Sequence, residues 1–330
     1  MKYMAFVVSE DLQGEFKGSV NELDTQDLPD GDVLIKVEYS SLNYKDALSA
    51  SGNKGVTRTY PHTPGIDAAG VVAESQSDQF VAGQKVLVVG YDLGMNTSGA
   101  FGGYIRVPAS WVMPLPEGMR AKQAMAWGTA GFTSALCVEK LITHGILPSH
   151  GPVIVSGGTG GVGSVAIKLL VKLGYVVHAI TSKSNAGDYL SKLGVAKIVP
   201  LNEFVDGSKR PLLKPAYSAG IDVAGGAVLS SMLKVIDYQG VVACCGLVDS
   251  PALDTTVLPF ILRGVTLAGV DSVELPLNKK TTVWGKMSRE WLLDDIEANA
   301  KEIALTELSS ALSEILKGKA VGRFILKHDS

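Results

Sequence analysis

A glycine-rich run between an apolar segment and a helical one constrains this chain more than any other feature. The run Gly157–Gly163 (GGTGGVG) follows the β-rich segment Val153–Ser156 and opens the helical pattern Val162–Leu173. Glycines at such a strand–turn–helix junction allow a tight turn and close approach of a pyrophosphate, and the helix N-terminus supplies N–H groups. The sequence therefore predicts dinucleotide binding here, with a purely structural turn as the alternative; the predicted contacts are Gly158, Thr159, Gly160, Gly161, Val162 and Gly163.

Short apolar runs alternate with helical segments around this turn. The predicted helices include Ala121–Ile142, Val162–Leu173 and Ala227–Ile236. The predicted strands are Val153–Ser156, Tyr175–Ile180, Lys197–Val199, Gly220–Ala224, Val241–Cys245 and Val265–Val270. This alternation indicates a parallel, doubly wound sheet whose strands are buried on both faces. We expect it to form a dinucleotide-binding domain over residues 123–270.

The flanking segments have a different character. The N-terminal part is rich in β patterns such as Val33–Tyr39 and is punctuated by glycine and proline, which suits a compact barrel. The C-terminal part contains an amphipathic helix, Leu305–Leu316, and a closing strand, Gly322–Lys327. We expect this tail to rejoin the first domain, so that residues 1–122 and 271–330 form one unit.

The end of the second predicted strand bears on the choice of cofactor. A domain that prefers NAD places an acidic residue near this point for the adenosine ribose, but here no acid occurs before Asp188. Thr181, Ser182 and Lys183 stand there instead, and hydroxyls with a lysine suit a 2′-phosphate. The sequence therefore predicts NADPH, with a merely solvated Lys183 as the alternative.

Composition excludes several other classes of protein. The 330 residues have a net charge of −3, so no basic face indicates nucleic acid, and no apolar run is long enough to span a membrane. The three cysteines, Cys137, Cys244 and Cys245, form no metal or disulfide pattern and are expected to pack in the interior. We expect a cytoplasmic protein that acts on a small molecule.

Longer motifs carry a family resemblance. The segments Ser41–Leu48 (SLNYKDAL), Pro64–Gly70 (PGIDAAG), Gly128–Thr133 (GTAGFT) and Gly269–Val273 (GVDSV) resemble the medium-chain dehydrogenase/reductase superfamily. The chain is most similar to its zinc-free, quinone-oxidoreductase-like branch and, within that branch, to bacterial NADPH-dependent acryloyl-CoA reductases. The resemblance implies a GroES-like β-barrel domain plus a Rossmann domain.

The zinc ligands of related dehydrogenases are missing from these motifs. Zinc-bearing relatives carry cysteine at the position of Asn43 and Gly-His-Glu at Gly65-Ile66-Asp67, whereas this chain has neither the cysteine nor the histidine. His62 lies near the second motif without a partner in the sequence pattern, and tetrahedral zinc prefers clustered Cys and His. We expect no metal.

The resemblance also implies site residues. Tyr44, Asn43 and Asp46 are the expected catalytic residues, and Asp67 and Arg323 the weaker expectations for substrate contact, although Asp46 and Asp67 could equally be structural. The expected contacts on the nicotinamide side are Tyr44, Leu247, Ile261, Ser272 and Gly318. Close relatives carry an arginine near Leu201 that this chain lacks, so Lys183 would carry more of the phosphate contact.

Three functions follow from these expectations. The first is NADPH-dependent reduction of an activated C=C bond, best exemplified by acryloyl-CoA to propionyl-CoA; the second is quinone reduction; the third is NADPH binding in a structural or sensing role with little turnover. A basic patch would favour CoA phosphates. The candidates for it, which could equally be ordinary surface charges, are Lys45, Lys54, Arg58, Arg263 and Arg323. The family resemblance further implies a homodimer, commonly formed through the sheet edge.

Overall fold

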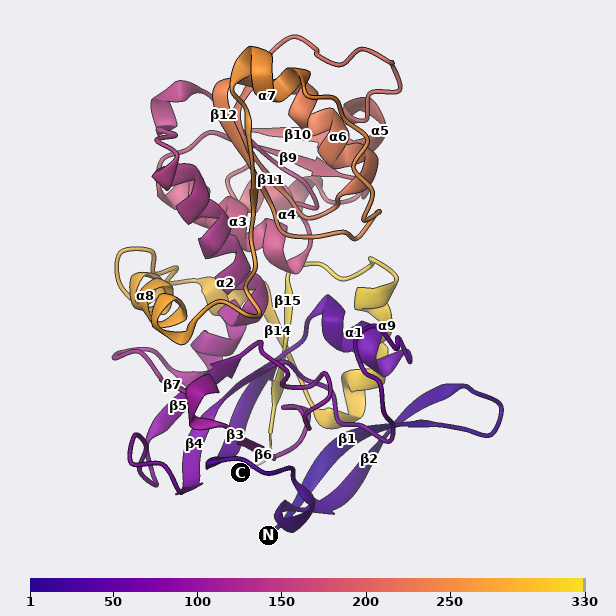
Figure 1. Ribbon diagram of the computed structural model, residues 1–330, viewed down its shortest axis with the longest axis vertical. Coiled ribbons are helices and arrows are strands. Elements are labelled where there is room, and N and C mark those ends of the chain that lie inside the picture. Colours follow the sequence, from indigo (N-terminus) through magenta and orange to yellow (C-terminus); the bar gives the residue numbers. More distant parts are fainter. Residues whose placement is uncertain (329–330) are drawn as a thin grey trace. The chain divides into compact units, whose positions relative to one another are not determined.

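The chain folds into two compact units (Figure 1). The computed structural model describes residues 1–328. The first unit contains Met1–Thr129 together with the chain from Ser272 onward, and the second unit is Ala130–Asp271. No helix in the described part of the chain is both long enough and apolar enough to cross a membrane.

A six-stranded, wholly parallel sheet forms the centre of the second unit. Its strands, in the order β10-β9-β8-β11-β12-β13, are Lys197–Pro200, Val177–Thr181, Val153–Val155, Tyr217–Asp222, Ile236–Cys244 and Thr266–Gly269. The chain builds outward from β8 in one direction and then returns to its other side, so β8 lies at the point where the strand order reverses. The predicted doubly wound sheet is therefore confirmed.

Helices cover this sheet. Their bounds are α3 Gly161–Lys172, α4 Gly187–Lys192, α5 Leu201–Phe204, α6 Gly226–Val235 and α7 Leu258–Arg263. The α3 helix packs on β8 and β9 because its apolar side chains recur at helical spacing and are buried. The predicted helices at α3 and α6 are confirmed, whereas the short helices α4, α5 and α7 gave no periodic signal to predict.

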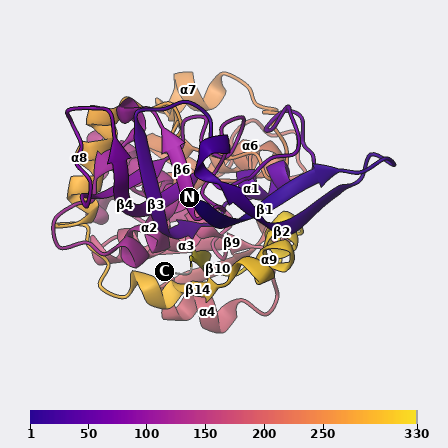
Figure 2. The same cartoon turned by 90° about the horizontal axis from the view of Figure 1, so that it is seen from below.

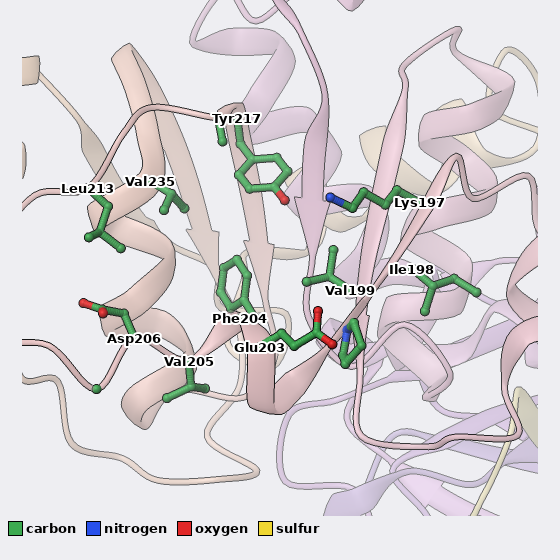
Figure 3. A pocket seen from close by; sticks show the side chains of 13 residues that line it. Lys197, Ile198, Val199, Glu203, Phe204, Val205, Asp206, Leu213, Tyr217 and Val235 are labelled. Atoms are coloured by element: carbon green, nitrogen blue, oxygen red, sulfur yellow. The ribbon is translucent and has the colours of Figure 1, made fainter.

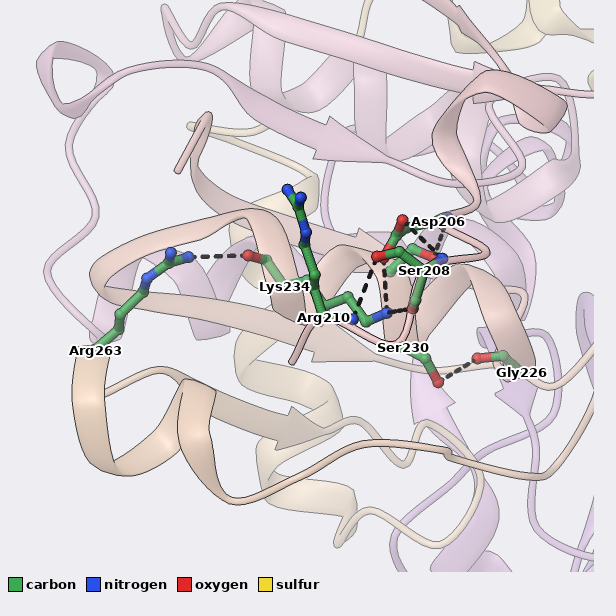
Figure 4. Close-up of polar contacts among 8 residues, drawn as sticks. Asp206, Ser208, Arg210, Gly226, Ser230, Lys234 and Arg263 are labelled. Carbon is green, nitrogen blue, oxygen red and sulfur yellow. Dashed lines mark hydrogen bonds and ion pairs between the residues drawn. The ribbon is translucent and has the colours of Figure 1, made fainter. Parts of the chain in front are cut away.

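Two basic side chains hold the segment 205–216 that joins α5 to β11 (Figure 4). Lys234 Nζ lies 2.8 Å from Asp206 Oδ2, and this contact lowers the pKa of Asp206 to about 2. Arg263 donates to the carbonyl oxygens of Lys234, Ile236 and Leu213. The prediction of Arg263 as a phosphate-binding surface charge is therefore wrong, because its guanidinium already caps three backbone carbonyls.

A seven-stranded, largely antiparallel sheet forms the barrel of the first unit. The strands of its main path, in the order β14-β15-β3-β4-β5-β7, are Ala300–Ile303, Arg323–Lys327, Val33–Ser41, Asp67–Ser75, Lys85–Val89 and Met113–Pro114, and β6 (Tyr104–Val107) also pairs with β3. The tail rejoins this unit as predicted, because β15 pairs antiparallel with β3. A hairpin of β1 (Lys2–Glu10) and β2 (Phe16–Asp24) extends outward from the barrel (Figure 2).

Four α-helices complete the described part of the chain. They are α1 Tyr44–Ala50, α2 Ala121–Thr143, α8 Leu277–Met287 and α9 Leu308–Leu316. The helical segment predicted for Ala121–Ile142 is confirmed as α2, and Gly128, with a φ of 51° and a ψ of −164°, interrupts it. The predicted helix from Leu305 begins as a 3₁₀ turn, Leu305–Glu307. Further 3₁₀ turns are Thr25–Asp27, Ala109–Trp111, Pro148–His150 and Ile296–Asn299.

Candidate active site

The glycine run forms the turn between β8 and α3. Gly157 has a φ of +59°, which favours glycine, and a Cβ there would lie 2.5 Å from Val223 Cγ2. A Cβ on Gly163 would overlap the carbonyl oxygen of Gly157, so α3 approaches the turn as closely as only glycine permits. These glycines are required by the local packing itself.

The same turn leaves the start of α3 open. Gly160 is the N-cap of α3 and has no side chain to occupy the first N–H groups of the helix. Free N–H groups and the positive end of the helix dipole suit an anion such as a diphosphate. The backbone here therefore fits the phosphates of a dinucleotide.

The predicted 2′-phosphate residues lie beside this turn. The N–H of Gly158 donates to the carbonyl of Ile180 at 3.2 Å, which places the turn against the carboxyl end of β9. Thr181 Oγ1 accepts from the N–H of Lys183 at 3.1 Å, and Ser182 is exposed. Lys183 is half-buried, and this burial lowers its pKa. Two hydroxyls and an amine therefore follow β9 at the edge where the turn lies.

The buried carboxylate of Asp222, which was not predicted as a site residue, makes hydrogen bonds beside the glycine turn. Asp222 ends β11 and accepts from Ser156 Oγ at 2.8 Å and from the N–H of Gly225 at 2.7 Å. Ser156 Oγ also accepts from the N–H of Val223 at 2.9 Å. An acidic residue at the end of an apolar strand was the available signal. These hydrogen bonds fix the carboxyl ends of β8 and β11, between which the turn emerges.

A cavity of about 460 Å³ lies in the second unit (Figure 3). Lys197 and Tyr217, which begin β10 and β11, line it together with Pro200 at the end of β10 and Phe204 of α5. The cavity therefore follows β10 along its whole length.

Cys137 and Cys244 offer no reactive thiol. Cys137 is buried, and a hydrogen bond with Cys245 together with burial raises the pKa of its thiol. Burial also raises the pKa of Cys244. A thiol whose pKa is raised is a poor nucleophile near neutral pH.

In the first unit, Asn43, Asp46, Asp67 and Arg323 come together as one buried charge cluster. Asn43 is the N-cap of α1, and its N–H donates to Asp46 Oδ2 at 2.7 Å. The other oxygen of Asp46 accepts from the N–H of Ile66 at 2.9 Å. Burial, followed by the charge of Asp67, raises the pKa of Asp46 to about 7. Asp46 therefore holds the start of α1 rather than facing solvent.

Asp67 is the centre of this buried charge cluster. It accepts from Asn43 Nδ2 at 2.8 Å, from the N–H of Thr129 at 2.7 Å and from the hydroxyls of Ser41 and Thr129. The break in α2 makes this possible, because a Cβ on Gly128 would lie 2.8 Å from Asp67 Oδ2. Sequence reasoning noted Ser41 and Thr129 only as parts of motifs and missed their role here.

Arg323 supplies the positive charge of the buried charge cluster. Its Nη1 donates to the carbonyl of Leu42 at 3.1 Å and to Asn43 Oδ1 at 3.4 Å. The residue is only 3% exposed, and burial lowers the pKa of its guanidinium. The prediction of Arg323 as a surface charge for CoA phosphates is therefore wrong. Within residues 1–328, its Nε and Nη2 have no hydrogen-bond partner.

The remaining predicted residues are dispersed between the two units. Tyr44 is half-buried and begins α1 directly after the capping residue Asn43. Ser272 is buried, and Gly318 is an exposed residue just beyond α9. In the second unit, Leu247 and Ile261 are 60% and 68% exposed. The structure thus brings Asn43, Asp46, Asp67 and Arg323 together within the first unit.

The other predicted basic residues, Lys45, Lys54 and Arg58, belong to the first unit. Lys54 Nζ pairs with Glu10 at 3.2 Å and lies over the rings of Phe16 and Tyr60. Lys45 is half-buried on α1, and Arg58 is exposed. Among residues 1–328, no group of three or more His, Cys, Asp or Glu side chains could hold a metal ion.

Two known family models match separate parts of the chain. The alcohol dehydrogenase GroES-like domain matches residues 29–117, and the zinc-binding dehydrogenase domain matches residues 161–287. The chain belongs to the medium-chain dehydrogenase/reductase family, with a GroES-like domain and a parallel-sheet Rossmann domain. The predicted family and fold class are confirmed.

Three relatives match almost the whole chain. Acrylyl-CoA reductase AcuI of Ruegeria pomeroyi is 42% identical over 98% of both chains. The yhdH oxidoreductase of Salmonella enterica, solved in complex with NADP, is 41% identical with a TM-score of 0.95 over all of both chains. The putative quinone oxidoreductase YhfP of Bacillus subtilis is 41% identical over 93% of this chain and 94% of its own. Its structure with NAD bound has a TM-score of 0.95 over 99% of both chains.

Proposed function

We propose that this chain is an NADPH-dependent reductase of an activated C=C bond, with acryloyl-CoA as the substrate and propionyl-CoA as the product. The observation that carries the proposal is the glycine turn at the switch point of the sheet, in a chain 42% identical to an acrylyl-CoA reductase over nearly its full length. We assign cofactor binding to residues 123–270 and substrate chemistry to 1–122 and 271–330.

The backbone of the turn binds the cofactor diphosphate in this proposal. The contacts come from Gly158, Thr159, Gly160, Gly161, Val162 and Gly163, at or near the start of α3. The N–H groups of Gly158 and Gly160 already donate to the carbonyls of Ile180 and Gly157, so the donors to the anion come from the other N–H groups. Thr181, Ser182 and Lys183 bind the 2′-phosphate and select NADPH over NADH. Leu201 packs in the apolar core instead of supplying the arginine of close relatives, so Lys183 carries more of this contact.

The cofactor, when bound, supplies a hydride to the β-carbon of the enoyl thioester. Donors of this chain stabilise the negative charge that develops on the thioester oxygen. Tyr44 orients the reacting groups or donates the proton to the α-carbon, and Asn43, Asp46, Asp67 and Arg323 hold the start of α1 on which Tyr44 stands. Leu247, Ile261, Ser272 and Gly318 complete the nicotinamide contacts.

No metal takes part in the proposed reaction. Asn43 and Ile66 stand where zinc-bearing relatives place cysteine and histidine, and an amide and an alkyl side chain do not hold zinc. A conjugated thioester is already polarised, so its reduction does not require a Lewis acid. The guanidinium of Arg323 supplies the local positive charge within the barrel.

A homodimer is part of the same proposal. Val257 and Leu262 on and beside α7 are large apolar side chains that are more than half exposed. The α7 helix precedes β13, which is an edge strand of the six-stranded sheet. A second copy of the chain that covers this edge would remove both the apolar side chains and the open strand from water.

Quinone reduction is the second candidate, because the B. subtilis relative carries that name. The test follows NADPH absorbance with acryloyl-CoA, crotonyl-CoA and a simple quinone in parallel. Turnover of the thioesters with little turnover of the quinone supports the proposal, and turnover of the quinone alone contradicts it. Tight NADPH binding without turnover of any substrate would instead indicate a structural or sensing role.

A further inference from the structure

A fully buried lysine in the first unit takes no part in the function proposed above. Lys280 lies on α8 and is 0% exposed. Its Nζ donates to the carbonyl of Val89 at 2.7 Å and to the carbonyl of Val273 at 2.8 Å. One ammonium thereby joins the end of β5 to the segment that follows Ser272.

The aromatic ring of Tyr91 also contacts the ammonium group of Lys280. Lys280 Nζ lies 3.4 Å from the ring centroid, a cation–π contact that is strong when it is shielded from water. The hydroxyl of Tyr91 donates to the carbonyl of Leu275 at 3.2 Å, and its N–H donates to the carbonyl of Val273 at 3.2 Å. Lys280 and Tyr91 therefore donate four hydrogen bonds. One goes to the last residue of β5, and three go to carbonyls of the segment Ser272–Leu275.

The backbone at this point is shaped for the contact. Tyr91 has a φ of +54°, a conformation that costs a non-glycine residue about 1–2 kcal/mol. The preceding Gly90 also has a positive φ, and a Cβ on it would lie 3.1 Å from Val273 Cα and 3.3 Å from Lys280 Nζ. A glycine at position 91 would avoid the strain, so the ring and hydroxyl of Tyr91 compensate for it.

The charge of Lys280 is also costly by itself. Burying an ammonium loses its hydration, and an apolar side chain of similar length would fill the same volume without that loss. What an apolar side chain cannot do is fix two carbonyl oxygens in one place. The contacts therefore point to a need for precise placement of the segment Ser272–Leu275, beyond simple stability.

We propose that Lys280 and Tyr91 are positioning residues that fix the segment Ser272–Leu275 so that Ser272 can contact the cofactor. This inference rests on the proposed function, because it takes Ser272 as part of the nicotinamide site. Neither residue touches the cofactor in this account. Both act through the carbonyls of Val273 and Leu275.

The test compares Lys280→Met with Val283→Ala, a substitution of another buried residue on the same helix. We measure the NADPH dissociation constant by fluorescence, the KM for NADPH, kcat, and the urea unfolding of each variant. The expected result is a dissociation constant and KM for NADPH raised at least about fivefold in Lys280→Met, with kcat changed less. Val283→Ala should be destabilised while keeping the NADPH affinity of the wild type.

A second variant, Tyr91→Gly, relieves the positive φ and removes the ring, so it keeps the test available if Lys280→Met does not fold. We expect the same loss of NADPH affinity in Tyr91→Gly. NADPH binding equal to that of the wild type in the folded variants would overturn the positioning role and leave the proposed function intact. If the wild type itself binds no NADPH, both the proposed function and this inference fail.

Discussion

The glycine turn of the second unit is formed by backbone groups, whereas the buried charge cluster of the first unit is formed by side chains. The turn relies on backbone, because its glycines leave room for N–H groups at the start of α3. The buried charge cluster relies on side chains from α1, β4 and β15, which are distant in sequence. The first is a local structure that leaves no room for a Cβ at Gly157 or Gly163, and the second is a long-range structure held by side-chain hydrogen bonds.

The largest expected effect is on the buried charge cluster. Arg323→Met removes a cation that interacts with Asp46 and Asp67, and removing one partner of a buried ionic group costs about 3–5 kcal/mol. We expect a loss of that size in the free energy of unfolding, measured by urea titration. The double variant Asp67→Asn/Arg323→Met should lose less than the sum of the two single variants. Additive losses would show that the residues do not act as a cluster.

A side chain added to the glycine turn should weaken NADPH binding. Gly163→Ala places a Cβ on the carbonyl oxygen of Gly157, and neither backbone atom can move away cheaply. We expect NADPH affinity to fall at least about 100-fold, or about 2.7 kcal/mol, by fluorescence titration. Gly187→Ala is the matched control, because a Cβ there meets nothing within 4 Å. Unchanged binding in Gly163→Ala would refute the backbone account of the turn.

The raised pKa of Asp46 makes a prediction about pH. Its pKa is about 7 in the folded chain against an ordinary value of 3.8, so the folded state binds more protons between these values. Stability from this group is therefore complete below about pH 4 and is lost as pH rises through 7, with a slope of at most about 1.4 kcal/mol per pH unit. Relative to the wild type, Asp46→Asn should lack this dependence in urea unfolding at pH 5 and pH 8. An identical pH dependence of unfolding in the wild type and in Asp46→Asn would show that Asp46 does not cause it.

The smallest effect concerns cofactor choice. Lys183→Ala should weaken NADPH binding about tenfold, or about 1.4 kcal/mol, and NADH binding much less, because only NADPH carries the 2′-phosphate. Lys192→Ala, which removes an exposed lysine of α4, controls for the loss of one charge. An equal loss of affinity for NADPH and NADH would show that Lys183 does not select NADPH.

Local patterns explain what could be predicted from the sequence. The strand before the glycine turn, the turn and α3 are neighbours in the chain, so their spacing predicts both the structure and the binding of a dinucleotide. The closing strand was also predictable, because Arg323–Lys327 has strand-forming residues and follows a glycine. Short elements such as α4 and β14 contain too few residues to show a period.

Long-range contacts explain what could not be predicted. Nothing near Arg323 in the sequence shows that its partners are Leu42, Asn43 and Asp67, so the sequence alone gives no reason to place it in the interior. Arg263 was misjudged for the same reason, since its carbonyl partners lie as much as 50 residues away. The break of α2 at Gly128 likewise depends on Asp67 and Ser41, which approach from another part of the chain.

One measurement tests the central claim most directly. NADPH carrying deuterium at the transferable position of nicotinamide C4 is mixed with the enzyme and acryloyl-CoA, and the product is analysed by mass spectrometry and NMR. The account predicts propionyl-CoA with one deuterium on the β-carbon and a solvent-derived proton on the α-carbon. Propionyl-CoA without deuterium on the β-carbon, or no propionyl-CoA while a quinone is reduced, would contradict it.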